Sequence, residues 1–531
     1  MLAMLSTRRT ARRCVCAGAV ALALLGAGPP LAAGGGDRPD LSRFYRQKVS
    51  WSACGADMPK DMQCGKVTVP LDYARPGART LDLALARYRA TGPSRGSVLL
   101  NFGGPGGPGV QQLATGADDF MDLTNGYDVV SFDPRGVGRS SPVTCGRGGD
   151  QDPASTGGSP DHSDPQALIK QWQRVAAECA RSSSPVLAHI GTVNAARDLD
   201  VIRQALGDKK LNYLGFSYGT RLGAVYAAQF PDKVGRLALD GVDTLTESLA
   251  QQGVVAAEGQ QTALDDFLDW CVREVTCPFG QDRRAADAQV LRLVRSLDKN
   301  PVSTDVGGRL SGQDLVGAIG QALYSKRTWP SLERAVAALV DDGDTRRIEA
   351  FVPGGVALPT RREPAERRDG GLVDPADVPL DNTLAAMMAI NCADDPDRPG
   401  AGQITRDLPR LRADYEQASP VFGQYRLSEL LMCYGRPKGS DFIREKVKNV
   451  DTAKMLLVGT RGDPATPYRW AVETARRLGS SAVVLDNKGD GHTGYGSSRC
   501  VHRKVNDFLL YGSLPPDGSS CPADPAATTN R

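Results

Sequence analysis

The chain has 531 residues, of which 41% are hydrophobic and 24% charged, which allows one large domain with an insertion or two to three ordinary domains. Its formal net charge is +3, but four arginines lie in the first 33 residues, so the remainder carries 60 basic against 61 acidic side chains. Because an excess of basic residues is what attracts nucleic acids and anionic membranes, this near-neutral body argues against both as the main partner.

The N-terminus has the features of an export signal. Arg8, Arg9, Arg12 and Arg13 precede an apolar stretch at about 15–27, which is followed by small residues up to position 33. The apolar stretch is too short to serve as a bilayer-spanning anchor of the mature protein. We therefore interpret residues 1–33 as a signal peptide and expect a secreted, extracellular protein with no stable membrane anchor.

Removal of that signal leaves ten cysteines, an even number. In an exported protein an even count favours disulfides over free thiols or a metal site. The sequence does not fix the connectivity, but pairing each cysteine with its neighbour gives five candidates: Cys54–Cys64, Cys145–Cys179, Cys271–Cys277, Cys392–Cys433 and Cys500–Cys521.

Between residues 66 and 240 short apolar strands alternate with helical patterns. Strands are expected at 66–70, 81–88, 97–102, 128–132, 211–214 and 234–239, and helices at 194–206 and 218–230. This alternation is typical of an α/β protein with a doubly wound, mostly parallel sheet. The Gly-, Ser-, Asp- and Pro-rich stretch between 145 and 165 indicates a mobile loop.

After residue 244 the periodicity becomes helical, with helices expected at 263–275, 285–297, 313–323, 331–340, 383–390 and 408–418. An Arg-, Pro- and Gly-rich stretch at 353–371 interrupts the block. Strand character returns at 455–458 and 482–485, before a closing helix at about 500–510. Because the sheet begins before the helical block and ends after it, we expect an inserted helical cap. The predicted boundaries are 44–245 and 446–512 for the core, 246–445 for the cap, and 513–531 for a flexible tail.

The sequence Gly-Phe-Ser-Tyr-Gly at 215–219 lies between an expected strand and the helix that follows it. This GxSxG pattern places Ser217 on a sharp strand-to-helix turn, where an α/β-hydrolase holds its nucleophile, and the glycines let strand and helix approach closely. The string at 92–96 fits the same pattern, but it contains Pro93 and no helix follows it. Ser217 is therefore the expected nucleophile.

A nucleophilic serine needs a general base, and the base needs a carboxylate that orients it. In the α/β-hydrolase order both follow the serine, which leaves His492 and His502 of the four histidines. His492 lies in a glycine-flanked loop after the last strand, whereas His502 falls within the closing helix. The predicted acid is Asp463, which follows the strand at 455–458, because its two competitors share the strand and loop of His492: Asp486 and Asp490.

The glycine-rich stretch 101–109 follows the strand at 97–102 and can bring bare backbone close to a substrate. We expect the N–H of Tyr218 to donate to the oxyanion of the tetrahedral intermediate, together with that of Gly103 or Gly104. The stretch also contains GxGxxG, a dinucleotide-binding pattern, but Pro105 and Pro108 remove N–H groups that a pyrophosphate would use. No zinc, P-loop or EF-hand motif occurs, so we expect no metal and no cofactor.

With these motifs the chain resembles the secreted tripeptidyl aminopeptidases, relatives of the prolyl aminopeptidases within the α/β-hydrolases. The matching segments are 101–109, 133–140, 215–220, 239–242, 459–467 and 491–492, within a span of about 50–512. The resemblance implies a serine exopeptidase that releases short peptides from free N-termini through an acyl-enzyme on Ser217, with His492 and Asp463. Its partners would be peptide substrates, while the oligomeric state is not predicted.

An exopeptidase of this kind must bind the substrate's ammonium group, and a carboxylate in the cap is the natural partner. Asp394 and Asp395 are the candidates, because a disulfide at Cys392 would fix them over the site, and Glu258 is the second choice. The alternative within enzymes is a secreted carboxylesterase with the same triad, since ester cleavage needs no ammonium pocket. An inactive fold that only binds a partner is disfavoured by the intact triad.

Overall fold

The computed structural model describes residues 39–146, 165–183, 185–304, 308–352, 371–426 and 429–524. The expected signal peptide at 1–33 lies outside these ranges, as do most of the loop expected at 145–165 and of the interruption expected at 353–371. The elements described below all belong to the unit Asp40–Arg531.

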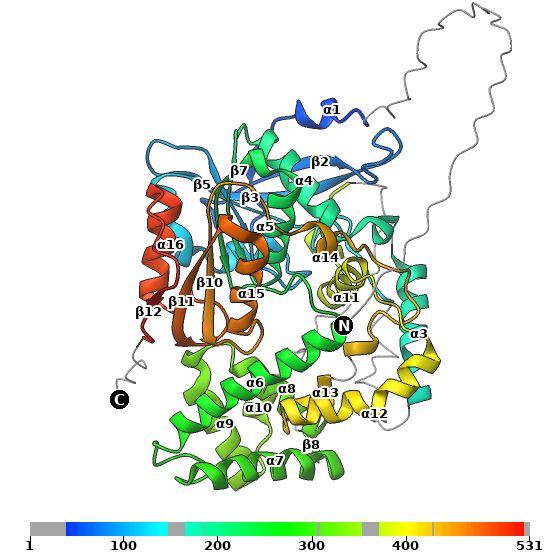
Figure 1. The fold of residues 1–531 in the computed structure, drawn as a ribbon, viewed down its shortest axis with the longest axis vertical. Coiled ribbons are helices and arrows are strands. Elements are labelled where there is room, and N and C mark those ends of the chain that lie inside the picture. Colours follow the sequence, from blue (N-terminus) through cyan, green and yellow to red (C-terminus); the bar gives the residue numbers. More distant parts are fainter. Residues whose placement is uncertain are drawn as a thin grey trace, which may run out of the picture. The chain divides into compact units, whose positions relative to one another are not determined.

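A ten-stranded sheet is the centre of this unit, in the order β1-β2-β3-β5-β4-β6-β7-β10-β11-β12 (Figure 1). Neighbours from β1 to β5 in this order pair antiparallel, and all pairs from β5 to β12 are parallel. The predicted doubly wound, mostly parallel sheet is confirmed, since the chain winds from β4 to β5 on one side and from β6 onward on the other. The strands are β1 (Ser52–Ala53), β2 (Gln63–Pro70), β3 (Thr80–Tyr88), β4 (Ser97–Asn101), β5 (Asp128–Phe132), β6 (Leu211–Phe216), β7 (Val234–Asp240), β10 (Met455–Gly462), β11 (Ala482–Asp490) and β12 (Ser519–Cys521).

Helices cover both faces of the sheet, because successive strand residues point to opposite sides. Val98 and Leu100 of β4 belong to the apolar cluster that includes α2 and α16, whereas Leu99 between them belongs to the cluster of α4, α5 and α15. These helices flank the strands in Figure 1. Their bounds, with those of their short neighbours, are α1 (Ser42–Tyr45), α2 (Gly109–Thr115), η1 (Ala117–Asn125), α3 (Pro165–Ser182), η2 (Pro185–His189), α4 (Thr192–Ala205), α5 (Tyr218–Gln229), η3 (Pro231–Lys233), α15 (Tyr468–Leu478), η7 (Gly479–Ser481) and α16 (Arg499–Tyr511).

The described residues between β7 and β10 are helical apart from the small antiparallel pair β8 (Val302–Ser303) and β9 (Arg309–Leu310). Helices α6 to α9 share an apolar core of their own, which includes Phe267, Trp329 and Phe422. Helix α6 also lies against β10. An inserted helical block is what the sequence predicted, and its boundaries stay a prediction. The elements are α6 (Leu249–Cys271), α7 (Arg283–Lys299), α8 (Gly312–Ala322), η4 (Lys326–Thr328), α9 (Trp329–Asp342), α10 (Arg346–Glu349), η5 (Pro375–Asp377), α11 (Asn382–Asp394), α12 (Ala401–Ala418), α13 (Gly423–Arg426), η6 (Glu429–Leu431) and α14 (Phe442–Lys446).

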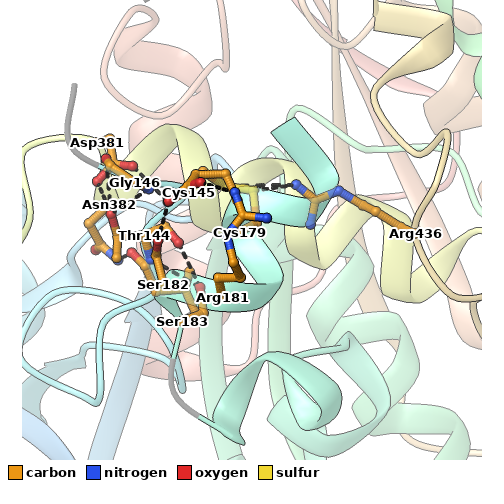
Figure 2. The surroundings of a disulfide bond; sticks show 12 residues. Thr144, Cys145, Gly146, Cys179, Arg181, Ser182, Ser183, Asp381, Asn382 and Arg436 are labelled. Atoms are coloured by element: carbon orange, nitrogen blue, oxygen red, sulfur yellow. Dashed lines mark hydrogen bonds and ion pairs between the residues drawn. A yellow bond between two sulfur atoms is a disulfide. The ribbon is translucent and has the colours of Figure 1, made fainter. Parts of the chain in front are cut away.

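Five disulfides join the cysteines in the neighbour pairs expected from the sequence. Figure 2 shows the surroundings of Cys145–Cys179, where the backbone N–H of Cys145 and the hydroxyl of Thr144 donate to the carboxylate of Asp381 at 2.8 and 2.7 Å. Asp381 precedes the first residue of α11, so this contact ties the segment at Thr144 and Cys145, after β5, to a helix of the inserted block. The Arg436 guanidinium lies 2.9 Å from the Cys179 sulfur.

The predicted flexible tail at 513–531 requires a correction. Residues 519–521 form β12, the edge strand of the sheet, which pairs in parallel with β11. The disulfide between Cys500 in α16 and Cys521 in β12 holds this segment in place. The composition of the tail, rich in Pro and Ser, concealed the strand because the covalent link rather than a long apolar pattern fixes it.

Candidate active site

Ser217 sits at the turn between β6 and α5 with the backbone angles φ 55° and ψ −125°. A positive φ is costly for a residue with a side chain and persists only where the surrounding structure enforces it. Here the backbone N–H of Ser217 donates to the carbonyl of Asp240 on the neighbouring strand at 3.0 Å. The side chain is half-buried at the carboxyl end of the sheet, as the GxSxG pattern predicted.

The two glycines of the turn are required by close packing. A Cβ atom on Gly215 would lie 2.5 Å from the carbonyl oxygen of Gly219, and one on Gly219 would lie 2.6 Å from that of Asn101. Both distances fall well inside van der Waals contact, so any larger residue would push strand and helix apart. The geometry therefore accounts for the glycines at both ends of the pattern.

His492 and Asp463 are hydrogen-bonded to each other. The ring Nδ1 of His492 lies 2.9 Å from Oδ1 and 3.0 Å from Oδ2 of Asp463. Asp463 follows β10 and His492 follows β11, so the two side chains meet at the carboxyl edge of neighbouring parallel strands. With Nδ1 turned to the carboxylate, the other ring nitrogen, Nε2, is the one that can exchange a proton with a substrate or a nucleophile.

The Asp463 carboxylate is fully buried and accepts several further hydrogen bonds. Its donors are the backbone N–H groups of Ala465, Thr466 and Thr493 at 2.8 to 3.1 Å and the hydroxyl of Thr466 at 3.0 Å. Burial alone would raise the pKa of Asp463, but His492 and these N–H donors together lower it below its usual range. The carboxylate is therefore held ionised beside the imidazole.

The pKa of His492 is shifted in the opposite direction. Burial alone would lower it, but the negative charges of Asp463, Asp240 and Asp243 outweigh burial and raise the pKa above its ordinary value. The ring also packs against the strand that neighbours the serine, because a Cβ atom on Gly241 would lie 3.4 Å from its Cε1 atom. This arrangement favours the imidazolium that forms when the ring accepts a proton.

The competing acids have other partners. Asp486 forms a two-pronged ion pair with Arg461 at 2.8 and 2.9 Å, and Asp490 pairs with Lys326 of η4. His502, the competing histidine, lies in α16, 3.4 Å from the Asp122 carboxylate. The structure thus brings Asp463, rather than its rivals, to His492.

The glycine-rich stretch after β4 packs directly on the serine turn. A Cβ atom on Gly103 would lie 2.5 Å from the carbonyl oxygen of Phe216, 2.9 Å from the Ser217 Cβ atom and 3.2 Å from the Tyr218 nitrogen. The N–H of Gly103 donates to the side chain of Asn101 at 3.1 Å. Because that donor is already engaged, Gly104 and Tyr218 are the remaining candidates for the oxyanion donors.

Asp394 and Asp395, the acids predicted to bind a substrate ammonium, are buried and already paired. Asp394 accepts hydrogen bonds from the backbone N–H and hydroxyl of Thr192 and lies 3.6 Å from Arg221. Asp395 pairs with Arg444 at 2.9 Å. Both carboxylates are therefore engaged within the protein, by partners that the sequence could not reveal because they lie far away in the chain.

Glu258, the second choice, lies in α6 with a side chain that is 49% exposed and 3.3 Å from Arg469. The next residue, Gly259, packs on the loop of the predicted acid: a Cβ atom there would lie 3.2 Å from the Asp463 carbonyl oxygen. Of the three predicted acids, Glu258 is the one that combines an exposed carboxylate with a position beside this loop.

Sequence reasoning missed several residues that surround the triad. An aromatic cluster joins the three loops: Phe102 before the glycine stretch, Phe216 before the serine and Tyr495 after the histidine, with ring centroids 5.9 to 6.0 Å apart between neighbours. From the cap, the ring of Tyr324 packs edge-on to His492 at 5.0 Å. Phe102 and Phe216 stand within or beside predicted motifs in the sequence, but the contacts of these aromatic residues could not be read from it.

Among the described residues, no group of three or more His, Cys, Asp or Glu side chains is arranged to hold a metal ion. In the same part of the chain, none of the helices combines the length and the apolar character of a bilayer span.

Comparison with known proteins identifies the family. Residues 97–337 match the family described as alpha/beta hydrolase fold, and residues 419–521 match the family described as TAP-like protein. The chain is 32% identical over 497 residues to serine protease Hip1 of Mycobacterium tuberculosis, with 90% of this chain and 91% of that protein covered.

Two other relatives carry different names. The chain is 32% identical to a tripeptidyl aminopeptidase of Streptomyces lividans, with 89% of this chain and 86% of that protein covered. It is 31% identical to carboxylesterase B of Mycobacterium tuberculosis, with coverage of 93% and 95%. The chain therefore belongs to the tripeptidyl-aminopeptidase-like family of α/β-hydrolases, and it is a serine hydrolase of the aminopeptidase type.

Proposed function

We propose that this chain is a secreted serine exopeptidase that removes short peptides, of tripeptide length, from free N-termini. The observation that carries the proposal is the placement of a strained serine turn and a His492–Asp463 pair at the same edge of one sheet. The relatives named serine protease and tripeptidyl aminopeptidase support peptide cleavage as the reaction.

In the proposed mechanism, Nε2 of His492 accepts the Ser217 proton while the serine oxygen attacks the scissile carbonyl. Asp463 fixes the ring orientation and stabilises the imidazolium. The N–H groups of Tyr218 and Gly104 hold the oxyanion of the tetrahedral intermediate. The imidazolium then gives its proton to the leaving amine, and water hydrolyses the acyl-enzyme with His492 again acting as the base.

Selectivity for a free N-terminus requires a negative charge at the far end of the acyl site. We assign this role to Glu258, because its carboxylate is half-exposed and its helix packs on the loop of Asp463. A charge-assisted hydrogen bond to the ammonium contributes about 1.5–3 kcal/mol, which corresponds to a preference of roughly tenfold to hundredfold over a blocked peptide.

A carboxylesterase with the same triad is the second candidate. It is favoured by the relative named carboxylesterase B and by the engagement of both Asp394 and Asp395 in internal ion pairs. With both of those carboxylates buried in ion pairs, the ammonium pocket depends on Glu258, whose half-exposed carboxylate lies 3.3 Å from Arg469.

One assay separates the two candidates. It compares hydrolysis of a free tripeptide anilide, its N-acetylated form and a short acyl ester by wild type and by Ser217→Ala. The proposal expects cleavage of the free tripeptide to exceed that of the acetylated form by at least about tenfold, with all rates lost in the variant. Cleavage of the ester alone would favour the esterase, and equal cleavage of both peptides would refute recognition of the ammonium.

Secretion is the remaining part of the proposal. Five disulfides support an oxidising compartment, and residues 1–33 supply the expected signal. Protein recovered from the culture medium of an expressing host is expected to begin at or near Gly34, as read by N-terminal sequencing. An unprocessed chain retained inside the cell would contradict this assignment.

A further inference from the structure

Asp240, the last residue of β7, lies between the two halves of the site. Its backbone carbonyl accepts the N–H of Ser217 at 3.0 Å. Its side chain points to the histidine loop, where the carboxylate accepts the N–H of Gly494 at 2.9 and 3.0 Å and that of Tyr495 at 2.7 Å. One residue therefore contacts both the nucleophile turn and the loop of the base.

The histidine loop has little regular structure of its own. Gly491 and Thr493 have φ angles of 97° and 68°, and for the β-branched threonine this conformation is strained. Such a conformation persists only if the surroundings determine it. The hydrogen bonds made by the loop's backbone N–H groups are therefore what fixes the direction of the His492 ring.

Those hydrogen bonds can be followed one by one. The N–H groups of residues 491 and 492 donate to the carbonyls of Gly462 and Tyr324 at 3.1 and 2.8 Å. The N–H of residue 493 donates to Asp463 at 3.1 Å, and the N–H groups of 494 and 495 donate to Asp240. Asp240 thus accounts for two of five consecutive anchors, and these two connect the loop to the end of β7.

The Asp240 carboxylate is completely buried, and it acts on the base through its charge as well. Burial raises its pKa to about 6, while the N–H donors of Gly494 and Tyr495 oppose the rise. The carboxylate is therefore ionised above about pH 7, where its charge adds to that of Asp463 in favouring the imidazolium of His492.

We propose that Asp240 is a positioning residue of this active site, which holds the loop of His492 against the end of β7, beside the Ser217 turn, and favours the protonated ring with its charge. The inference rests on the proposed function, because it concerns the efficiency of the same triad. Unlike Asp463, Asp240 makes no hydrogen bond to the imidazole and acts on it through the loop and through its charge.

The test compares Asp240→Asn with Asp240→Glu. An asparagine oxygen in the place of Oδ2 can still accept from Gly494 and Tyr495, but its N–H₂ group then faces the N–H of Gly494, so the variant weakens that anchor and loses the negative charge. The glutamate keeps the charge but displaces the carboxylate by one methylene. Asp486→Asn is the matched control, because Asp486 is a buried carboxylate on β11, two strands away in the sheet, that pairs with Arg461.

We expect kcat of Asp240→Asn to fall roughly tenfold to hundredfold, with KM changed by less than about threefold, because a displaced base slows chemistry more than binding. The charged groups that face His492 are Asp463, Asp240 and Asp243, and each of them raises the pKa of the ring. Because Asp240→Asn removes one of these charges, the acid limb of its pH–kcat/KM profile should move to lower pH. Asp240→Glu should also lose kcat but keep the acid limb of the wild type. Asp486→Asn should match the wild type in both.

A purely structural role would lower the melting temperature without moving the acid limb. The inference is refuted if Asp240→Asn matches Asp486→Asn in kcat and in the position of that limb. If Asp240→Asn does not fold, the kcat of Asp240→Glu is the deciding measurement, and a wild-type kcat in that variant refutes the inference. Labelling of wild type by a fluorophosphonate distinguishes failure of the proposed function, because an unlabelled Ser217 would contradict the triad itself whatever the Asp240 variants do.

Discussion

Replacement of Asp463 by asparagine perturbs the site at one point while keeping its shape. The carboxylate accepts a hydrogen bond from His492, three backbone N–H groups and the hydroxyl of Thr466. An asparagine can supply one acceptor oxygen, so its N–H₂ group must face either the backbone donors or the imidazole. Two of the backbone donors, Ala465 and Thr466, bond to Oδ1, whereas Thr493 bonds to Oδ2. We therefore expect the amide oxygen to keep the place of Oδ1 and the amide nitrogen to take that of Oδ2, which lies 3.0 Å from Nδ1 of His492.

In that orientation the amide donates to Nδ1, which forces the neutral ring to carry its proton on Nε2, where the serine proton must be accepted. The variant also loses the charge that raises the pKa of His492. Holding the ring in the wrong tautomer costs roughly 10⁴ in kcat, or about 5.5 kcal/mol of transition-state stabilisation. Most of the fold's stability should remain, since the backbone hydrogen bonds to Oδ1 are kept.

The assay is steady-state hydrolysis of a tripeptide anilide at pH 8, with circular dichroism and a thermal melt as checks of folding. The matched control is Asp490→Asn, which alters a carboxylate two residues before His492 that pairs with Lys326. A folded Asp463→Asn that retains more than about a tenth of wild-type kcat would refute the reasoning, as would a larger loss in Asp490→Asn.

Three other predictions follow from the structure. The acid limb of the pH–kcat/KM profile should have its midpoint above 6.5, because a raised pKa keeps His492 protonated to higher pH; a midpoint below 6 would contradict the charge environment. Glu258→Gln should reduce the preference for free over N-acetylated tripeptide by about tenfold or more, whereas Glu473→Gln, which alters another partner of Arg469, should not; equal effects would remove Glu258 from the site. Replacing Cys500 and Cys521 by serine should lower the free energy of unfolding by about 3 kcal/mol, measured by calorimetry, with kcat unchanged; an unchanged melting temperature would contradict the role given to this disulfide.

Much of the sheet could be predicted, because its strands carry apolar runs bounded by Gly and Pro. The bounds of the helices were predicted less accurately. Helix α6 begins at Leu249, whereas the pattern predicted a start at 263, since Gly253 and Gly259 weaken the apparent propensity of its first half. Both glycines are explained by tertiary contacts: a Cβ atom on Gly253 would lie 2.0 Å from the Tyr415 hydroxyl, and one on Gly259 2.5 Å from Pro467. Helix α15 was missed because it follows Pro467 directly and its apolar face is narrow.

The contact between Asp463 and His492 could be predicted, because the order of the motifs and the small number of histidines leave few choices. Asp240 could not be identified as a partner of the histidine loop, since it lies 254 residues before Gly494 and no local pattern marks the contact. The partners of Asp394 and Asp395 could not be identified for the same reason. These acids follow the disulfide-bonded Cys392, and Thr192, Arg221 and Arg444 approach their carboxylates from distant segments.

The central claim is that Ser217 becomes acylated during turnover, and rapid acid quenching followed by peptide mass spectrometry tests it most directly. With a free tripeptidyl ester as substrate, the account predicts a tripeptidyl mass increase on the peptide that contains Ser217, and its absence, with loss of turnover, in folded Ser217→Ala. An adduct on another residue, or turnover by Ser217→Ala at the wild-type rate, would contradict the account.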